Sequence, residues 1–376
     1  MNLNITVFGL SITSSWGNGH ATTYRALLKA LAQRGHRVTF LERDVPWYRA
    51  HRDLPDPSYC RVDLYSELKE VSSRFAKIVS DADLVILGSY VPDGAMIADW
   101  ITTNAKGVTA FYDIDTPITL AGLECGKAEY ISAALIPRFD LYLSFTGGPV
   151  LEVIETAYGS PRARPLYCSV DPDLHKPVPT TTNWRLGYLG THSEDREQKL
   201  HDLLIAAAKQ LPQERFVVAG SSYPEATVWP ANVERVEHVP PEAHSNFYCS
   251  QSYTLNITRA NMVKAGFSPS VRLFEAAAAG VPIITDRWAG IESIFKPDEE
   301  ILIADLSEHV VNILTALPED RRRAIAAAAR KRVLADHTAE RRARQLEEYY
   351  QEVLTRNLVR VRNRASREGL RVDAAV

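Results

Sequence analysis

The chain has 376 residues, of which 45% are hydrophobic and 24% are charged, and its formal net charge is −3. These values exclude a disordered chain, and the small negative charge gives no electrostatic attraction to nucleic acid, so nucleic acid is not an expected partner. The length exceeds what a single hydrophobic core usually supports, which predicts two domains.

Residues 1–170 alternate apolar strands with longer amphipathic segments, which is typical of βαβ units and a parallel sheet. We expect a helix at residues 21–34 that ends at Gly35. The expected strands are residues 5–10, 37–41, 84–88, 108–112 and 141–145. This part of the chain is interpreted as a Rossmann-like domain.

The alternation stops at residues 171–183, which hold Pro172, Pro177, Pro179 and three consecutive threonines and therefore indicate a linker. It restarts in residues 184–340, with a helix expected at 194–210. The expected strands are residues 185–190, 216–220, 254–258, 281–285 and 301–304. Two α/β domains joined in this way would enclose a cleft between the carboxyl ends of two sheets, where ligands bind in open α/β sheets.

The C-terminal part, with residues 341–376 as its last segment, is expected to be helical, with helices at residues 319–335 and 339–358. A basic run from Arg356 to Arg367 follows. This run could touch anionic lipid or an acidic partner and so hold the protein weakly at the inner face of a membrane. The alternative is a frayed, solvated C-terminus.

The four cysteines, Cys60, Cys125, Cys168 and Cys249, are scattered and form no C-x-x-C pair. We therefore expect free thiols in a reducing compartment rather than a zinc site or a disulfide framework. No apolar run approaches the roughly 20 residues that span a bilayer, and the N-terminus lacks the basic start of a signal peptide. These features predict a cytoplasmic protein.

The first candidate site is the loop Gly17-Asn18-Gly19-His20, between the first strand and the first helix. The glycines permit a tight turn and a close approach of the backbone to a ligand. His20 would lie near the positive end of the helix dipole, which disfavours the imidazolium and leaves a neutral ring that can accept a proton. Thr22 replaces the last glycine of a G-x-G-x-x-G motif. The alternative is a glycine turn with a histidine on the helix surface.

The second candidate site is Asp113-Ile114-Asp115-Thr116-Pro117, at the end of an expected strand. Asp113 and Asp115 are two residues apart, so on an extended backbone they would point to the same side. Two carboxylates there could raise each other's pKa, hold a cation or accept sugar hydroxyls. The alternative is an Asx turn that caps the helix ahead of Pro117.

The third candidate site follows the first strand of the second domain. Gly190 would let the backbone approach a ligand, Thr191 offers a hydroxyl, and Arg196 could pair with a diphosphate. Arg259 and Lys264, after a later strand, are candidates for a second cation. The alternative for Arg196 is a surface ion pair with a neighbouring acid.

The fourth candidate site is a short helix that feeds a buried strand. Ser268 can cap this helix with Pro269 at its first position, and Gly280 closes it. Arg272 and Glu275 share one face with Ser268, and a charged pair next to a helix N-terminus suits a nucleotide diphosphate. The alternative is an i,i+3 salt bridge between Arg272 and Glu275 on a solvated face.

The stretch from Ser268 to Gly280, SPSVRLFEAAAAG, resembles the donor-binding helix of B-fold glycosyltransferases. It is most similar to the spore-maturation (CgeB-type) branch, whose pattern is roughly SPSxRxFEAAACG. The resemblance implies that Glu275 holds the ribose hydroxyls of the donor nucleotide. Related retaining families carry a second acid, separated from this glutamate by seven residues, that touches the donor sugar. Phe267 stands at that position here, which leaves the donor-sugar contacts and the stereochemistry open.

The resemblance also implies an architecture: an α/β fold of two Rossmann-like domains (GT-B) with C-terminal helices that cross back to the first domain. Residues 1–170 would bind the acceptor and residues 184–340 the donor. The loop that holds Gly17, Asn18 and Gly19 would face the acceptor, and in some inverting families a histidine just after it is the catalytic base. The CgeB-type branch carries a similar D-x-D-T-P segment, which favours a role in the cleft for Asp113 and Asp115.

The implied reaction moves a sugar from a nucleotide-diphospho-sugar, with a UDP-sugar as the default, to a sugar, lipid, small-molecule or protein hydroxyl. The helix N-terminus at Ser268 and Ser270, with Arg196 and Arg259 or Lys264, would stabilise the leaving diphosphate, so we expect neither a metal nor another cofactor. Two alternatives stay open. One is a nucleotide-sugar epimerase of the same fold, and the other is a nucleotide-sugar-binding protein without activity.

Overall fold

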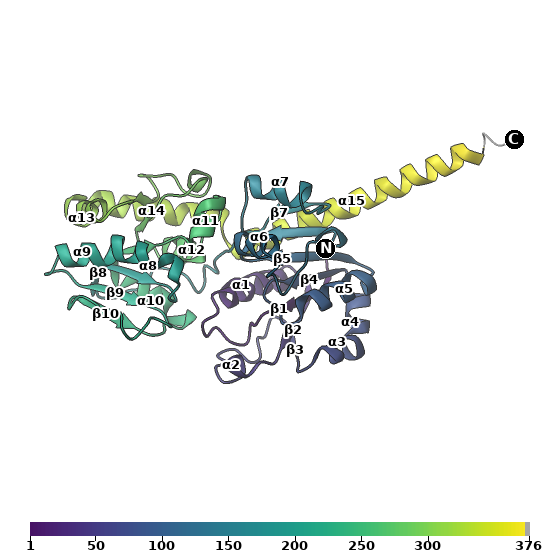
Figure 1. The fold of residues 1–376 in the computed structure, drawn as a ribbon. Helices are drawn as coiled ribbons and strands as arrows, with labels where there is room; N and C mark the ends of the chain where they lie inside the picture. Colours follow the sequence, from purple (N-terminus) through teal and green to yellow (C-terminus); the bar gives the residue numbers. More distant parts are fainter. Residues whose placement is uncertain (373–376) are drawn as a thin grey trace.

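Two parallel β-sheets, each flanked by helices, make up the two halves of the protein in the computed structural model, which describes residues 1–372 (Figure 1). The strand order is β3-β2-β1-β4-β5-β6-β7 in the first sheet and β10-β9-β8-β11-β12-β13 in the second. In each sheet the order reverses at one point, between β1 and β4 and between β8 and β11. Open α/β sheets bind ligands at such points.

The strands are short and follow the expected alternation with helices. In the first sheet they are β1 (Asn4–Gly9), β2 (Arg37–Arg43), β3 (Arg61–Tyr65), β4 (Leu84–Gly88), β5 (Val108–Asp113), β6 (Leu141–Ser144) and β7 (Ala163–Pro165). In the second they are β8 (Trp184–Leu189), β9 (Phe216–Ala219), β10 (Val233–Val236), β11 (Gln251–Asn256), β12 (Ile283–Thr285) and β13 (Leu302–Ile303).

The helices cover both faces of each sheet. In the first half they are α1 (His20–Gln33), α2 (Pro46–Arg49), α3 (Leu68–Arg74), α4 (Ala76–Asp81), α5 (Gly94–Asn104), α6 (Thr116–Glu124), η1 (Ile136–Arg138) and α7 (Pro149–Thr156). In the second half they are α8 (Glu194–Leu200), the π-helical turn η2 (His201–Ile205), α9 (Ala206–Gln210), η3 (Pro241–Ala243), α10 (His244–Cys249), α11 (Ala260–Ala265), α12 (Val271–Ala278), η4 (Ile291–Ser293), α13 (Ser307–Ala316), α14 (Glu319–Asp336) and α15 (Ala339–Val372).

Three strands that the sequence pattern did not predict, β3, β7 and β10, all lie at an edge of a sheet. Edge strands are covered less completely, so they need no continuous apolar run. In β3, for example, only Tyr65 is buried and the other four residues are exposed or half-buried. The expected helix at residues 194–210 is present, but its middle turn is π-helical.

The two connections between the halves lie side by side. Val170, at the end of the first half, forms an isolated parallel bridge with Thr338, which precedes α15. The Val170 amide donates to the His337 carbonyl at 3.2 Å, and the Ala339 amide donates to the Val170 carbonyl at 2.8 Å. Any rotation of one half against the other therefore bends both connections at the same place.

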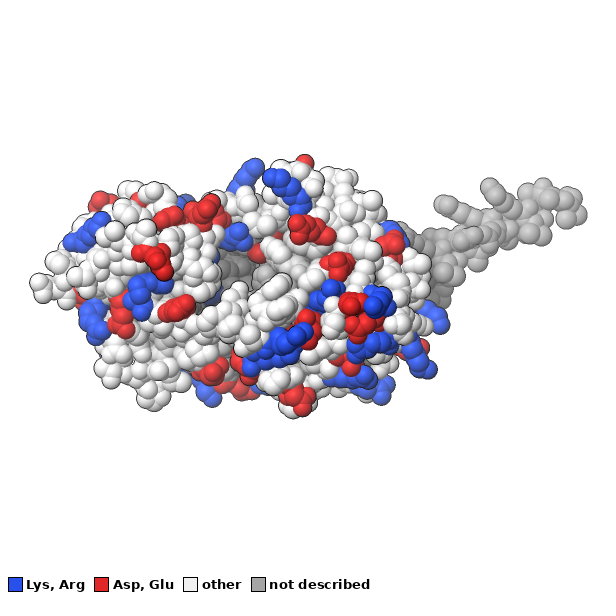
Figure 2. Space-filling view, turned by 60° about the horizontal axis from the view of Figure 1, so that its bottom comes forward, with Lys and Arg blue, Asp and Glu red and all other residues white. Residues whose placement is uncertain are grey.

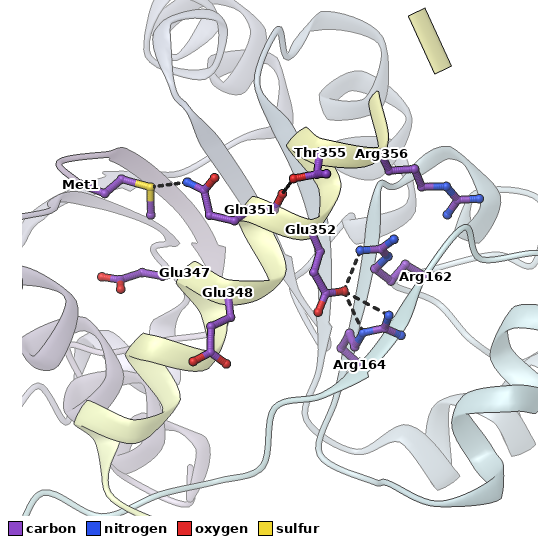
Figure 3. A pocket seen from close by; sticks show the side chains of 9 residues that line it. All are labelled: Met1, Arg162, Arg164, Glu347, Glu348, Gln351, Glu352, Thr355 and Arg356. Carbon is purple, nitrogen blue, oxygen red and sulfur yellow. Dashed lines mark hydrogen bonds and ion pairs between the residues drawn. The ribbon is translucent and has the colours of Figure 1, made fainter. Parts of the chain in front are cut away.

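Helix α15 returns from the second half and packs on the first, as the resemblance implied (Figure 1). The Arg34 guanidinium pairs with Glu347 at 2.7 Å and with Glu340 at 3.1 Å. At the far edge of the sheet, the Glu352 carboxylate accepts from Arg162 at 2.6 Å and from Arg164 at 3.1 Å (Figure 3). The first half is thus completed by a helix from the end of the chain.

The basic run that begins at Arg356 lies on the last turns of α15, but its side chains from residue 357 onward are outside the described residues. None of the helices within residues 1–372 combines the length and the apolar character that crossing a bilayer requires.

Candidate active site

A cleft of about 640 Å³ lies between the carboxyl ends of the two sheets. From the first half it is lined by the loops after β1, β4, β5 and β6. From the second half it is lined by the loops after β8, β9, β10 and β11 and by the start of α12. The surface is hollowed between the two halves, and charges of both signs are mixed around it (Figure 2). The cleft thus includes both points at which the strand order reverses.

The buried side chains of Glu42 and Asn18 help to hold the loop before α1, and the Glu42 carboxylate accepts from two of its backbone amides. The Asn18 amide donates to two carbonyls within the loop, at 3.1 and 3.3 Å, and its oxygen accepts from the His20 amide at 3.2 Å. Gly17 has a φ of +59°, which favours glycine, and a Cβ added to Gly17 or Gly19 would meet nothing within 4 Å. The loop is therefore fixed at its base and open towards the cleft.

His20 is the first residue of α1 and lines the cleft. Its ring stacks on Tyr90 with centroids 5.6 Å apart, and its Nε2 lies 3.8 Å from an Asp115 oxygen. Burial lowers the pKa of His20 below its usual 6.5, and the Arg259 guanidinium acts in the same direction, although Asp115 opposes both. The direction agrees with the sequence-based expectation, but its main cause is burial rather than the helix dipole.

Asp115 lies in the cleft at a contact between the two halves. Its Oδ2 accepts from the Tyr90 hydroxyl at 2.9 Å and lies 3.7 Å from the Arg259 guanidinium of the second half. Its side chain is 13% exposed, and it lies in the cleft lining. Asp115 is therefore placed to orient His20 and to attract Arg259.

Asp113 does not share this position, so the expectation that both carboxylates point to the same side is wrong. Asp113 is fully buried and accepts from Tyr142, from the Thr119 hydroxyl at 2.7 Å and from the Asp115 amide at 3.3 Å. The last bond is the Asx turn that the sequence left as an alternative. The chain turns into α6 directly after Asp113, so the alternation of an extended strand stops there. Burial raises the pKa of Asp113 to about 6.

The loop after β8 approaches the cleft through Gly190. A Cβ at this position would lie 2.6 Å from the Tyr188 hydroxyl and 2.8 Å from a nitrogen of Arg272, so only glycine fits without displacing them. Thr191 also lines the cleft, and its carbonyl accepts from the Arg196 guanidinium at 2.7 Å. Arg196 therefore lines the cleft and is tied to the loop after β8 by this hydrogen bond.

The two candidates for a second cation differ. Arg259 lines the cleft and lies 3.7 Å from Asp115 and 3.3 Å from Asp195, so it bridges acids from both halves. Burial would lower the pKa of Arg259, but these two carboxylates raise it. Lys264 is exposed in the last turn of α11 and does not line the cleft. Of these two cations, only Arg259 therefore lies in the cleft with the other candidate residues.

Helix α12 begins at Val271 with Ser270 at its N-cap, two residues later than the sequence pattern predicted. Ser270 donates its hydroxyl hydrogen to Asn256 at 2.7 Å and lines the cleft. Ser268 is buried outside the lining, where its hydroxyl bonds Thr146 of the first half at 2.9 Å. The N-terminus of α12 opens onto the cleft, and Ser268 instead joins the two halves.

Arg272 and Glu275 are both buried, with 8% and 2% exposure, so the alternative of a salt bridge on a solvated face is wrong. The Arg272 guanidinium stacks on Tyr188 at 4.7 Å and donates to Asn256 at 2.7 Å and to the Leu189 carbonyl. Both side chains line the cleft. A rigid, buried cation therefore lies beside Gly190, close to the N-terminus of α12.

Glu275 is surrounded by polar groups that the sequence analysis did not single out. The Tyr248 hydroxyl donates to its Oε2 at 3.1 Å, His244 Nδ1 lies 3.3 Å from the same oxygen, and His175 Nε2 lies 3.5 Å from Oε1. Burial would raise the pKa of Glu275, but His244, His175 and Tyr248 lower it to about 2. Glu275 is therefore an anion in the floor of the cleft.

His175, His244 and Glu275 come from three separate segments, and their ligand-type atoms lie within 4.8 Å of one another. Spacing along the sequence, on which the expectation of no metal rested, cannot reveal such a group. The only local signal was that His244 and Tyr248 are four residues apart and so share one face of α10. Tyr90, the ring partner of His20, had no signal in the sequence pattern.

Phe267 lies outside the cleft lining, between the two halves of the protein. Its ring fits against two glycines: a Cβ on Gly148 of the first half would lie 2.4 Å from it, and a Cβ on Gly290 would lie 2.3 Å from it. Phe267 itself has a φ of +49°, which is rare for a residue other than glycine. The aromatic ring at this position is thus a wedge between the halves.

Known structures share this whole architecture. Sucrose-phosphate synthase from Thermosynechococcus elongatus is 16% identical, with a TM-score of 0.66, covering 93% of this chain and 99% of that one. Anabaena HepE in complex with UDP and glucose is 13% identical, with a TM-score of 0.68, covering 94% and 100%. An alpha-glucosyltransferase in complex with UDP and DNA is 11% identical, with a TM-score of 0.70, covering 93% and 100%.

This chain has the B-type glycosyltransferase fold. Residues 196–348, which carry Arg259, Arg272 and Glu275, also match the family described as glycosyl transferase-like. None of the curated proteins matches the chain in sequence. The comparisons therefore show the fold of the whole chain and a glycosyl transferase-like segment in its second half.

Proposed function

We propose that the protein transfers a sugar from a nucleotide-diphospho-sugar, by default a UDP-sugar, to a hydroxyl-bearing acceptor. The observation that carries this proposal is the donor side of the cleft. There Glu275, Arg272 and the N-terminus of α12 lie together within the glycosyl transferase-like domain. The HepE structure holds UDP and glucose, and the alpha-glucosyltransferase structure holds UDP, which supports a UDP-sugar as the ligand.

The donor-side groups suit a leaving nucleoside diphosphate. Glycosyl transfer passes through an oxocarbenium-like transition state, so negative charge builds up on the diphosphate. Arg272 and Arg259 are fixed cations in the cleft, and Arg196 lies at its edge. The helix N-terminus adds a partial positive charge. These groups would stabilise the leaving group without a metal or another cofactor, while Glu275 would accept the ribose hydroxyls.

The first-domain groups suit the acceptor and the reacting centre. His20 is neutral, faces the cleft and lies beside Asp115, so it would take the proton of the acceptor hydroxyl if the reaction inverts the anomeric centre. In a retaining reaction the donor phosphate would take that proton, and His20 would only position the acceptor. Asp113 would act through the turn that carries Asp115. Phe267 stands where related retaining families have a second acid, and its ring packs between the two halves outside the cleft lining. This supports a donor site that lacks the second acid.

We also propose that the chain belongs to the CgeB-type branch, because of the pattern SPSVRLFEAAAAG. A further proposal is a cytoplasmic location, in which the basic C-terminal run makes weak contact with a membrane surface. The division of the chain at residues 171–183 into acceptor-binding and donor-binding domains belongs to the same proposal. The two sheets, which end at Pro165 and begin at Trp184, support it.

The function is tested in two steps. A thermal-shift panel of nucleotide sugars should show stabilisation that grows with ligand concentration, because a ligand that binds only the folded state stabilises it. The best donor is then incubated with and without candidate acceptors, and the products are analysed. Donor consumption that requires an acceptor supports transfer. An epimerised donor without acceptor would indicate an epimerase, and binding without turnover would indicate a binding protein.

A further inference from the structure

Buried polar atoms without hydrogen-bond partners gather around Glu275. His175 is 1% exposed, and neither of its ring nitrogens has a hydrogen-bond partner among the described residues. The same holds, within residues 1–372, for His244 Nδ1 and for Glu275 Oε1. Buried polar atoms are almost always bonded, and an ion is one of the partners that accounts for exceptions. These atoms therefore indicate that a further group binds between the three side chains.

The distances among the three side chains fit the ligands of one small metal ion. His175 Nε2 lies 3.5 Å from Glu275 Oε1, and His244 Nδ1 lies 3.3 Å from Glu275 Oε2. One ligand atom from each residue can be chosen so that all three lie within 4.8 Å of one another. Zinc–ligand bonds of about 2.0–2.1 Å in tetrahedral geometry place two ligands about 3.3 Å apart. The two close pairs therefore have the spacing of zinc ligands.

Two of the three side chains are already held in the way that metal ligands usually are. His244 Nε2 lies 3.1 Å from the Val239 carbonyl, which can only accept, so Nε2 carries a hydrogen. Glu275 Oε2 accepts from the Tyr248 hydroxyl at 3.1 Å. Metal-binding histidines commonly donate their other N–H to a carbonyl, and metal-binding carboxylates are themselves hydrogen-bonded. His244 Nδ1 and Glu275 Oε1 are thus the atoms left to bind an ion.

The third side chain, His175, is positioned by its backbone. Its amide donates to the Asp171 carbonyl at 2.8 Å. The Ser245 hydroxyl of α10 donates to the Leu174 carbonyl at 2.8 Å and accepts from the Lys176 amide at 3.2 Å. The chain is therefore fixed to α10 on both sides of His175, and the place of its ring is set before any ion binds.

The electrostatics of the group favour a cation. Burial lowers the pKa of His175 below 6.5, so this ring is neutral. Burial also opposes a charge on His244, but the Glu275 carboxylate raises the pKa of His244 above 6.5. A positive charge next to Glu275 is thus stabilised, and a metal ion can supply it in place of the proton on His244 Nδ1.

We propose that His175, His244 and Glu275 bind one Zn²⁺ ion. Two imidazole nitrogens and one carboxylate oxygen suit Zn²⁺, whereas Mg²⁺ and Ca²⁺ prefer oxygen ligands alone. His175 lies in the connection between the halves, and the other two ligands lie on α10 and α12. The ion therefore ties this connection to the second half and stabilises the fold. The inference goes beyond the proposed function and does not depend on it, because cationic side chains serve the diphosphate there.

The test measures Zn²⁺ binding by the full chain. Isothermal calorimetry gives the stoichiometry and the affinity for the parent chain and for His175→Gln. We expect one Zn²⁺ ion per parent chain and an affinity that is at least about 100-fold weaker in His175→Gln, because losing a ligand costs more than losing the group behind a ligand. His309→Gln, which alters an exposed histidine on α13, is the matched control and should bind Zn²⁺ like the parent.

A second variant and a second measurement cover the case in which His175→Gln does not fold. Tyr248→Phe keeps the aromatic ring but removes the hydrogen bond to Glu275 Oε2, and it should weaken Zn²⁺ binding about tenfold. If His175→Gln does not fold, unchanged Zn²⁺ binding by Tyr248→Phe overturns the inference. Zn²⁺ should also raise the melting temperature of the parent chain, since an ion that binds only the folded state stabilises it.

Two further results would contradict the site. Equal Zn²⁺ binding by the parent chain and by a folded His175→Gln would assign the metal to other residues. A parent chain that binds no Zn²⁺ would show that the three side chains do not form a metal site. Either result leaves the proposed function standing, because that function is tested with nucleotide sugars and acceptors.

Discussion

The two sides of the cleft are built differently. On the second-domain side, Arg272 and Glu275 are almost completely buried, and the Arg272 guanidinium and Glu275 Oε2 form hydrogen bonds to other segments. On the first-domain side, the side chain of His20 is 24% exposed, and Gly17 and Gly19 face open space. A rigid side loses little conformational entropy on binding, whereas an open side leaves room for a second substrate. If the protein has the proposed function, this comparison predicts a preformed donor site and an acceptor site that is completed by its ligand.

The largest effect on turnover is expected from a substitution of His20, on the first-domain side of the cleft. If His20 is the base, His20→Ala should lower turnover by about 10²-fold or more, because a positioned general base contributes that much, while UDP affinity stays nearly unchanged. Steady-state kinetics and calorimetry measure the two quantities. His309→Ala controls for the loss of a histidine elsewhere. Turnover within a few-fold of the parent would show that His20 is not a base and would favour a retaining reaction.

The pH profile of the parent chain sharpens this prediction. Because burial lowers the pKa of His20 below 6.5, the ring stays neutral as the pH falls past 6.5 and gains its proton only at a lower pH. The acid limb of kcat/KM should therefore lie below pH 6.5, with activity lost as the pH falls through the pKa of His20. His20→Gln should lack this limb, and a limb that persists in His20→Gln belongs to another group.

On the rigid side, Glu275→Ala should weaken nucleotide binding by roughly 1.5–3 kcal/mol, because a charged hydrogen-bond acceptor is removed. Calorimetry with UDP measures the change, and thermal unfolding checks that the fold persists. Glu292→Ala removes an exposed acid from the same domain and should bind UDP normally. Unchanged UDP affinity in Glu275→Ala would contradict the role of this residue.

Substitutions of one glycine on each side of the cleft test the difference in rigidity directly. Gly190→Ala places a methyl group against Tyr188 and Arg272, and such overpacking should lower the free energy of unfolding by about 1–3 kcal/mol and weaken UDP binding. Gly19→Ala enters open space at a φ of −62° and should change the free energy of unfolding by at most about 0.5 kcal/mol. Denaturant titration measures both. Equal effects would remove the distinction between a rigid and an open side.

The smallest effect is expected from metal removal. Cationic side chains and a helix N-terminus serve the diphosphate in the proposed function, so transfer with the best donor and acceptor should be unchanged by EDTA. Initial rates before and after chelation measure this. A complete loss with EDTA that Mg²⁺ or Mn²⁺ rescues would assign a metal to the cleft, with Asp115 as the first residue to mutate.

The sequence revealed the repeated strand–helix pattern and the Ser268–Gly280 segment because these signals are local: apolar runs, caps, glycines and a compact motif. Burial of Arg272 and Glu275 was not visible, since an i,i+3 pair looks the same on a solvated face. The separation of Asp113 from Asp115 depends on where β5 stops, within one or two residues. The meeting of His175, His244 and Glu275 depends on three segments that are distant in sequence, and no local pattern encodes it.

Helix α15 has a consequence for biosynthesis. Glu347 follows its partner Arg34 by 313 residues, and Glu352 follows its partner Arg162 by 190 residues, so the ribosome makes both glutamates much later than the arginines. The nascent first half is therefore without its covering helix until the second half has been made. A fragment of residues 1–170 should accordingly be poorly stable by itself, and a fragment expressed with residues 339–356 as a separate peptide is the better choice for studying the first half alone.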